Sequence, residues 1–196
     1  MNPLAVLALF FAGAVIGTLG DQIHVQFGVL SYPHPAPWLY GQASWVPLLF
    51  GCAGLALVLG NRTFIRPSLH PDIRTGDVLP ATLGEVLGSF VLFVAAYFST
   101  GLFQDHPRLL ALGLTAIWLL RIAPRPTRDK LLGGLASAVG GTLFEAALSS
   151  TGAFRYRSPD LWLVPIWLPA LYLHVSLATR DIYLAWFLPR PHVAVD

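Results

Sequence analysis

The sequence predicts an all-α membrane protein, a bundle of six transmembrane helices in a single domain that covers residues 1–196. Two features of the composition favour this fold class: 55% of the residues are hydrophobic and only 11% are charged, whereas charged residues make up about a quarter of an average soluble domain. The third observation is that six apolar segments approach the length of about 20 residues that a helix needs to cross a bilayer. These segments lie at about residues 4–24, 43–60, 81–103, 107–123, 131–154 and 161–187.

The composition also argues against several classes of function. The net charge of +2 is distributed over the connecting segments, so the basic patch of a nucleic-acid-binding protein is missing. Cys52 is the only cysteine, which excludes an intrachain disulfide and a cysteine-based metal site. The six histidines do not show the spacing of metal ligands. We therefore expect no nucleic-acid partner, no metal and no cofactor.

The first apolar segment contains Gly13 and Gly17, a pair of small residues typical of closely packed membrane helices. No basic residue precedes the segment and no A-x-A site follows it, which favours a retained helix over a cleaved signal peptide. Asp21 and His24 come directly after the segment, one helical turn apart. Either they share a proton, if the helix continues, or they are solvated at the membrane interface, and we favour solvation.

The next three segments have recognisable start or end signals. Pro47 lies where the first turn of the second helix is expected, a position that tolerates the missing N–H group. Glu85 is expected to be a first-turn acid of the third helix, near the positive end of the helix dipole. The fourth segment is the shortest because Arg121 comes early. It spans the membrane only if the Arg121 side chain extends to the interface.

The last segment is predicted to begin with a helix cap. Ser158, Pro159 and Asp160 have the residue types of an N-cap, a first-turn proline and a first-turn acid. Pro165 and Pro169 then predict a kink that frees backbone carbonyl groups for a partner or a ligand.

The fifth segment carries a single carboxylate near its middle, Glu145, at the end of a stripe of small residues. The stripe has four-residue spacing and consists of Gly133, Ser137, Gly141, Glu145 and Ser149. A lone carboxylate near the bilayer centre costs roughly 3 kcal/mol or more, so this face must contact protein or a cavity. We interpret Glu145 as the polar end of an internal pocket. The alternative is a protonated glutamate that bonds a neighbouring helix and only holds the bundle together.

Basic residues predict the orientation of the helices in the membrane. The connections on one side of the bundle hold nine of them, Arg62, Arg66, Arg74, Arg121, Arg125, Arg128, Lys130, Arg180 and Arg190. The connections on the opposite side hold Arg108, Arg155 and Arg157. Because cytoplasmic connections carry the excess of Lys and Arg, both termini are predicted to be cytoplasmic.

The sequence lacks the short motifs of hydrolases, metalloproteases and nucleotide-binding enzymes. An apolar bundle with grooves of small residues and buried polar groups favours a lipid or sterol binder. Two alternatives stay open. One is an intramembrane enzyme that acts on a lipid or isoprenoid through Glu145 with His24 or His174, although a lone histidine inside a bundle is more often a packing residue. The other is a scaffold whose small-residue faces form a homodimer or homotrimer.

Two motifs resemble segments of the Insig family. A-S-W-V-P at 43–47, followed by G-C-A at 51–53, resembles the family's A-W-W-V-P-x-C-C-G-T-A at the start of the second span. Y-R-S-P-D at 156–160, followed by W-L-P at 167–169, resembles Y-T-S-P-D and W-L-P at the start of the sixth span. The residues of this structural motif are Pro47, Ser158, Pro159, Asp160, Trp167 and Pro169.

The resemblance implies a protein that catalyses no reaction, holds an oxysterol in a cleft between helices and binds proteins with a sterol-sensing domain. V-L-F-V at 91–94 is similar to the family's A-V-F-V, whose Phe lines that cleft, and this nominates Phe93. With the physical interpretation of Glu145, the expected lipid-binding residues are Trp45, Phe93, Tyr97, Gly141 and Glu145.

The resemblance does not extend to the cytosolic loop after the fourth span. The family's F-D-R-S-R-S corresponds in position to residues 123–128. In the family, the Asp of this loop supports partner binding, but residues 123–128 contain no acid. The sequence therefore does not support partner docking of the family type. One lysine against eleven arginines suggests a prokaryotic relative in the plasma (inner) membrane. In such a membrane a neutral glycerolipid such as diacylglycerol is the expected alternative to a sterol.

Overall fold

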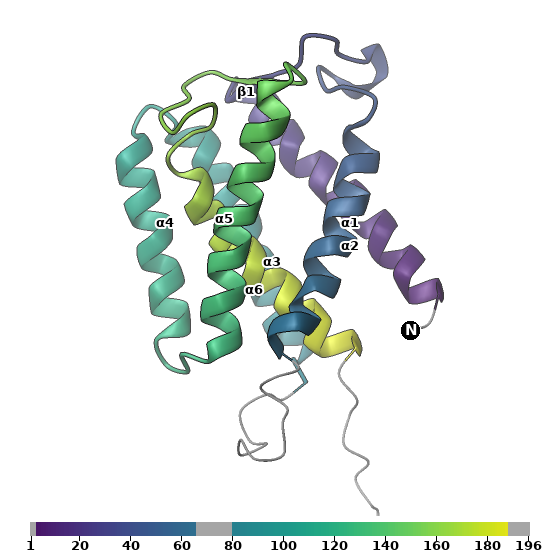
Figure 1. Ribbon diagram of the computed structural model, residues 1–196, viewed down its shortest axis with the longest axis vertical. Coiled ribbons are helices and arrows are strands. Elements are labelled where there is room, and N and C mark those ends of the chain that lie inside the picture. The colour runs from purple at the N-terminus through teal and green to yellow at the C-terminus, as the bar shows by residue number, and fades with distance from the viewer. Residues whose placement is uncertain (1–2, 66–79, 188–196) are drawn as a thin grey trace, which may run out of the picture.

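The computed structural model describes residues 3–65 and 80–187 as a bundle of six long helices (Figure 1). The helices are α1 (Pro3–Gln26), α2 (Val46–Ile65), α3 (Leu83–Leu102), α4 (Pro107–Ile122), α5 (Arg128–Ser150) and α6 (Leu168–Phe187). Short elements in the connections are β1 (Leu30–Ser31), the 3-10 helix η1 (Pro37–Leu39) and β2 (Arg155–Tyr156). In Figure 1, β1 lies at the upper end of the bundle, whereas α1 begins and α6 ends at the lower end.

Four of these helices, α1, α2, α3 and α5, are long and apolar enough to cross a membrane. The other two differ for identifiable reasons: α4 has 16 residues, and α6 carries Arg180 and Asp181 near its end. Large apolar side chains such as Leu4, Phe11 and Leu120 are more than half exposed on the outer surface. An apolar surface of this extent is typical of a protein that faces lipid.

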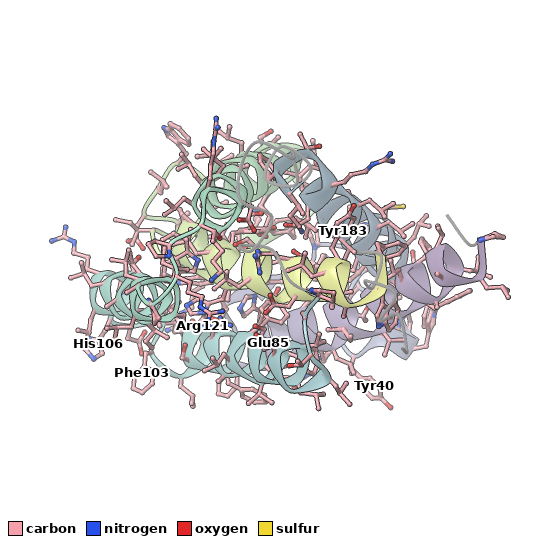
Figure 2. All side chains as sticks on the ribbon, turned by 90° about the horizontal axis from the view of Figure 1, so that it is seen from below. Tyr40, Glu85, Phe103, His106, Arg121 and Tyr183 are labelled. Carbon is pink, nitrogen blue, oxygen red and sulfur yellow. The ribbon has the colours of Figure 1, made fainter. Side chains whose placement is uncertain are left out.

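Helix α6 is the central element of the bundle. Seen from below, it lies between α3 on one side and α2 and α5 on the other, with α4 near one end (Figure 2). Half of its residues are buried, including Leu168, Leu171, His174 and Leu177. A helix that is buried on several faces is stabilised by tertiary packing rather than by one amphipathic stripe.

Close contact between α1 and α2 depends on glycine. A Cβ atom on Gly13 would lie 2.9 Å from the carbonyl oxygen of Phe50, and one on Gly54 would lie 3.0 Å from the Cα atom of Gly13. Gly17 accommodates the Phe50 ring, which would lie 2.4 Å from an added Cβ atom. The prediction that Gly13 and Gly17 mark a helix contact is therefore confirmed.

Two predicted helix starts are confirmed. Pro47 is the second residue of α2, where its missing N–H group costs no helical hydrogen bond. Glu85 completes a capping box at the start of α3: its carboxylate accepts from the Thr82 backbone N–H group at 2.8 Å, and the Thr82 hydroxyl accepts from the Glu85 N–H group at 3.2 Å.

The predicted cap of the last helix is wrong, because α6 begins at Leu168 rather than after Ser158, Pro159 and Asp160. Residues 161–164 instead form a tight turn in which Leu161 and Val164 exchange two backbone hydrogen bonds, with Trp162 at a left-handed φ of 55°. A proline ring disfavours helical geometry at the residue before it. Pro165 therefore disfavours a helix at Val164, and the helix starts later. Pro169 is then the second residue of α6, and the predicted interior kink does not occur.

Charged residues at the lower end connect four helices. Arg180 donates to Asp129 of α5 at 2.5 Å and to Asp181 at 3.2 Å. Ser89 of α3 donates to Asp181 at 2.5 Å and accepts from Arg121 of α4 at 2.7 Å. The Arg121 side chain therefore bonds within the protein instead of extending to the interface, which corrects the expectation from sequence. Arg66, Arg74 and Arg190, which contributed to the predicted orientation, lie outside the described residues.

We predict that Asp129→Ala destabilises the protein by about 3–5 kcal/mol, because it leaves the buried Arg180 guanidinium without its main counter-charge. Thermal unfolding of the detergent-solubilised protein measures the effect. Asp160→Ala at an exposed position is the control and should unfold like the wild type. Equal unfolding temperatures for the two variants would contradict the prediction.

Candidate functional site

An apolar cleft of about 160 Å³ lies between α1, α2, α3 and α6. Gly13 and Ile16 of α1 form one wall, and Phe93 of α3 and Val175 and Ala178 of α6 line other parts of it. These side chains offer neither charge nor hydrogen bonds. The cleft is therefore suited to hydrocarbon.

The cleft adjoins a smaller polar chamber of about 60 Å³, whose wall includes Asp21, His24 and Glu145. The two spaces share five wall residues, Phe50, Ala53, Tyr97, Glu145 and Tyr172. An apolar space thus adjoins a polar one, and apolar walls beside a few polar groups are the arrangement that small-molecule sites use to bury a ligand and fix its orientation.

Glu145 lies at the junction of the cleft and the chamber and accepts hydrogen bonds from two tyrosines. Tyr172 of α6 donates to its Oε1 atom at 2.6 Å, and Tyr156 of β2 donates to its Oε2 atom. Burial raises the pKa of Tyr156, which lies outside the helices, so its hydroxyl keeps its proton and acts as the donor. Glu145 combines the two roles considered from the sequence: it lines a cavity and it bonds to neighbouring elements.

The sequence analysis favoured solvation of Asp21 and His24 at the membrane interface. The structure instead buries both side chains. Helix α1 continues to Gln26, and the two side chains are only 4% and 2% exposed. Nor do they share a proton with each other: Asp21 accepts from Tyr32 at 2.8 Å and from Gln42 at 2.7 Å, and His24 bonds the Thr100 hydroxyl at 2.7 Å. Both line the polar chamber.

Four of the five residues expected to bind lipid line these cavities. Trp45 lines the chamber, Phe93 lines the cleft, and Tyr97 and Glu145 line both. Gly141 has a different role, because it accommodates Tyr172: an added Cβ atom would lie 2.3 Å from the tyrosine ring. The small-residue stripe of α5 is thus filled by a side chain of α6 at this point.

A second apolar cavity, of about 320 Å³, lies between α1 and α3. Ile16, Phe93 and Tyr97 line both this cavity and the cleft. The rings of Phe93 and Tyr97 contact each other edge to face with centroids 5.2 Å apart. Both aromatic residues therefore line the two apolar spaces, and Tyr97 lines the polar chamber as well.

The structure separates the residues of the proposed enzyme. His174 bonds the Leu114 carbonyl oxygen on α4 at 2.9 Å and lines none of the three cavities. His24 shares the chamber with Glu145, but within the described residues no hydrogen bond joins the two. His174 is thus a packing residue, as its position in the sequence favoured.

Several residues of the chamber were not predicted from the sequence. Tyr32 and Tyr156 come from the connections at the upper end, as does Gln42, which donates to Asp21 from behind the wall residues. β1 pairs with β2 and brings Leu30 opposite Tyr156. Aromatic and amide residues in a connection are normally interpreted as interface anchors. One signal in the sequence could have indicated these residues: the acids Asp21 and Glu145, once buried, need hydrogen-bond donors from elsewhere in the chain.

The fold and site define a class: a helical membrane protein with an internal apolar cleft that ends in a polar chamber. Residues 86–195 match a family model described as a protein of unknown function, DUF2878. The chain is 30% identical to the INSIG protein homolog of Mycolicibacterium vanbaalenii over 174 residues, 85% of this chain and 78% of that protein. It is 26% identical to the insulin-induced gene 1 protein of Danio rerio over 180 residues, 90% and 69% of the two chains.

The chain belongs to the Insig family. Its fold is similar to the crystal structure of a mycobacterial Insig homologue from Mycobacterium vanbaalenii, with a TM-score of 0.77, 24% sequence identity and coverage of 94% of both chains. A cross-linked trimer of that homologue is similar to the same degree, with coverage of 96% of this chain and 98% of the other. The resemblance inferred from the motifs is confirmed, and the protein is an integral membrane protein.

We predict opposite effects for two adjacent glycines of α5. Gly141→Ala should destabilise the protein by about 1–3 kcal/mol, because the methyl group overlaps the Tyr172 ring. Gly140→Ala is the matched control, since no atom lies within 4 Å of its Cβ position, and it should stabilise the helix by up to about 1 kcal/mol. Thermal unfolding of both variants checks the prediction, which fails if Gly141→Ala unfolds at the wild-type temperature.

Proposed function

We propose that this Insig-family protein binds a sterol or a neutral lipid such as diacylglycerol in the cleft, as a lipid sensor or binder that catalyses no reaction. The observation that carries the proposal is that the apolar cleft and the polar chamber adjoin and share the wall residues Tyr97, Glu145 and Tyr172. Hydrocarbon would fill the cleft and the polar head of the ligand would lie in the chamber.

The charge of the chamber favours an uncharged head. Its titratable wall residues include two carboxyl groups, Asp21 and Glu145, and neither bonds to Lys or Arg in the described part of the chain. A phosphate placed beside these carboxyl groups would be repelled without compensation, because charges in a low-dielectric site are poorly screened. A hydroxyl or ester head has no such cost.

The two apolar spaces favour a lipid with two chains or a broad sterol body. Phe93 and Tyr97 line both spaces, and Tyr97 also lines the chamber. A diglyceride would place one acyl chain on each side of these rings. A sterol would fill the cleft alone.

The enzyme alternative has little support from the geometry. A general base needs a proton to abstract within hydrogen-bond reach. In the described residues, the Thr100 hydroxyl that His24 bonds donates its proton to the Tyr97 carbonyl oxygen instead of to the imidazole. Among the same residues, Glu145 bonds two tyrosines and neither histidine.

We also propose that the protein forms a homo-oligomer. The solved Insig homologue with a similar fold is described as a cross-linked trimer. Small residues on the outside of the bundle, among them Gly88 and Gly113, have no neighbouring atom within 4 Å of their Cβ positions and would allow close approach of a second copy. The scaffold interpretation and the lipid-binding interpretation are therefore compatible.

Lipid retention tests the proposal. Native mass spectrometry of the gently purified protein should find one retained neutral lipid or sterol per chain. Ala53→Trp, at the junction of cleft and chamber, should reduce retention at least about tenfold by filling the space. Cys52→Trp is the matched control, since Cys52 is exposed on the outside of the same helix.

The same spectra report the oligomeric mass. Retention of bulk phospholipid alone, unchanged by Ala53→Trp, would reject lipid binding in this cleft and leave the scaffold interpretation. Glu145→Leu is a second probe: it should preserve the fold and weaken retention if the carboxyl group contacts the head of the ligand. A lower expression level with normal retention by the protein that is recovered would indicate a structural role.

We propose that all six helices cross the membrane with both termini in the cytoplasm. The distribution of basic residues supports this orientation. At the opposite end, Trp38, Tyr40 and Trp162 are 65%, 81% and 72% exposed and have the character of interfacial aromatic anchors.

Cysteine labelling tests the orientation in a Cys52→Ser background. Asp105→Cys, in the turn between α3 and α4, should react with a membrane-impermeant maleimide in intact cells. Ala123→Cys, after α4, should react only after the membrane is opened, because the two exposed positions lie on opposite sides. The reverse pattern would overturn the orientation, and labelling of both positions in intact cells would exclude a membrane-spanning α4.

A further inference from the structure

The two hydrogen bonds that Asp21 accepts both end on the same carboxyl oxygen. Tyr32 donates its hydroxyl proton to Oδ2 at 2.8 Å, and Gln42 donates an amide proton to Oδ2 at 2.7 Å. None of the described residues donates to Oδ1. Asp21 is 4% exposed and lines the chamber, so this second oxygen is open to a group that enters the chamber. Glu145 differs, since each of its oxygens accepts from its own tyrosine.

His24 presents a second acceptor on the next turn of α1. The Thr100 hydroxyl donates its proton to the Tyr97 carbonyl oxygen at 2.6 Å, so it must accept from Nε2 of His24, 2.7 Å away. Nε2 therefore carries the ring proton, and in the neutral imidazole Nδ1 is an acceptor. No described residue donates to Nδ1. The ring of His24 stacks on Tyr97 with centroids 4.6 Å apart.

Tyr97 supplies the complementary group. It lines the cleft, the second apolar cavity and the chamber, and among the described residues its hydroxyl has no hydrogen-bond partner. Buried polar groups in proteins are almost always paired. The chamber of about 60 Å³ has room for a small polar group, given that one water occupies about 30 Å³ in the liquid.

We propose that Asp21 selects ligands with a free hydroxyl group, which donates to Oδ1 of Asp21 and accepts from the hydroxyl of Tyr97. The inference rests on the proposed lipid-binding function and adds a specificity-determining residue to it. A diglyceride or a sterol with its hydroxyl free satisfies both contacts. The corresponding ether or ester has no proton to give and leaves the open acceptors of α1 unpaired.

The asymmetry of the Asp21 contacts makes one substitution especially informative. In Asp21→Asn, Tyr32 and Gln42 still need an acceptor at the position of Oδ2, so the amide oxygen takes that place. The NH₂ group then replaces Oδ1 and faces the chamber. The substitution keeps the size and the loop contacts of the side chain but converts an open acceptor into a donor.

The experiment compares dioleoylglycerol with its methyl ether, which has the same two chains but lacks the hydroxyl proton. Each lipid is added to the delipidated full-length protein in detergent, and retention is measured by native mass spectrometry and thermal shift. The wild type should prefer the free alcohol about tenfold, the effect expected when a buried acceptor loses its hydrogen bond. Asp21→Asn should lose or reverse this preference, because its amide donates to the ether oxygen.

Asp105→Asn, which makes the same chemical change at an exposed position, is the control and should keep the wild-type preference. Equal retention of alcohol and ether by the wild type, or an unchanged preference in Asp21→Asn, would overturn the inference while lipid binding stands. Retention of neither lipid, and of no sterol tested in the same way, would reject the proposed function itself. If Asp21→Asn does not fold, the wild-type comparison of alcohol and ether still decides the inference, and Tyr97→Phe should weaken the retention of both lipids, because each offers an oxygen that accepts from the Tyr97 hydroxyl.

Discussion

The need to pair carboxyl groups inside an apolar bundle controls the architecture of the upper half of this protein. Asp21 and Glu145 lie on α1 and α5, and neither helix supplies the hydrogen-bond donors they need. Tyr32, Gln42 and Tyr156 come from the connections, and Tyr172 comes from α6. An unpaired buried polar group costs several kcal/mol in a lipid environment, so these donors fix the connections over the end of the bundle.

The two ends of the bundle satisfy their acids in different ways. At the lower end Arg180 pairs with Asp129 and Asp181, and the charges of side chains compensate one another. At the upper end Asp21 and Glu145 bond only neutral donors among the described residues. The ion pairs of Arg180 at the lower end hold helices together and have little affinity for a neutral molecule. A carboxyl group held by neutral donors can add one more hydrogen bond from an uncharged ligand, and this difference assigns the two ends different roles.

Helix α6 connects the two ends. Val175 and Ala178 line the cleft, Tyr172 bonds Glu145 at the top of the cleft, and Arg180 and Asp181 follow within the next turns. Helix α3 also joins the two regions: Ser89 bonds Asp181 at the lower end, and the next residue, Phe90, lines the cleft. A ligand that separates α3 from α6 would therefore act directly on the hydrogen bond between Ser89 and Asp181.

The sequence by itself determined the class of the protein. Apolar segments, the glycine pair of α1 and the first-turn signals of Pro47 and Glu85 all depend on neighbours along the chain. The structure bears out the glycine pair and both signals, and in the described residues four of the six predicted segments form helices long and apolar enough to cross a membrane. The same holds for the family, which two local motifs indicated. Glu145 was found because a single acid in an apolar helix is conspicuous in any context.

The tertiary structure decided everything that depends on partners distant in the sequence. Asp21 and His24 appeared solvated because the sequence does not show that α1 continues past them into a chamber closed by residues 30–45 and 154–156. Gly141 appeared to line a groove, but Tyr172 of another helix fills it. Ser158, Pro159 and Asp160 had the composition of a cap, yet Pro165 and the turn before it moved the start of α6 to Leu168. Helical periodicity shows which residues share a face, and only packing shows what that face contacts.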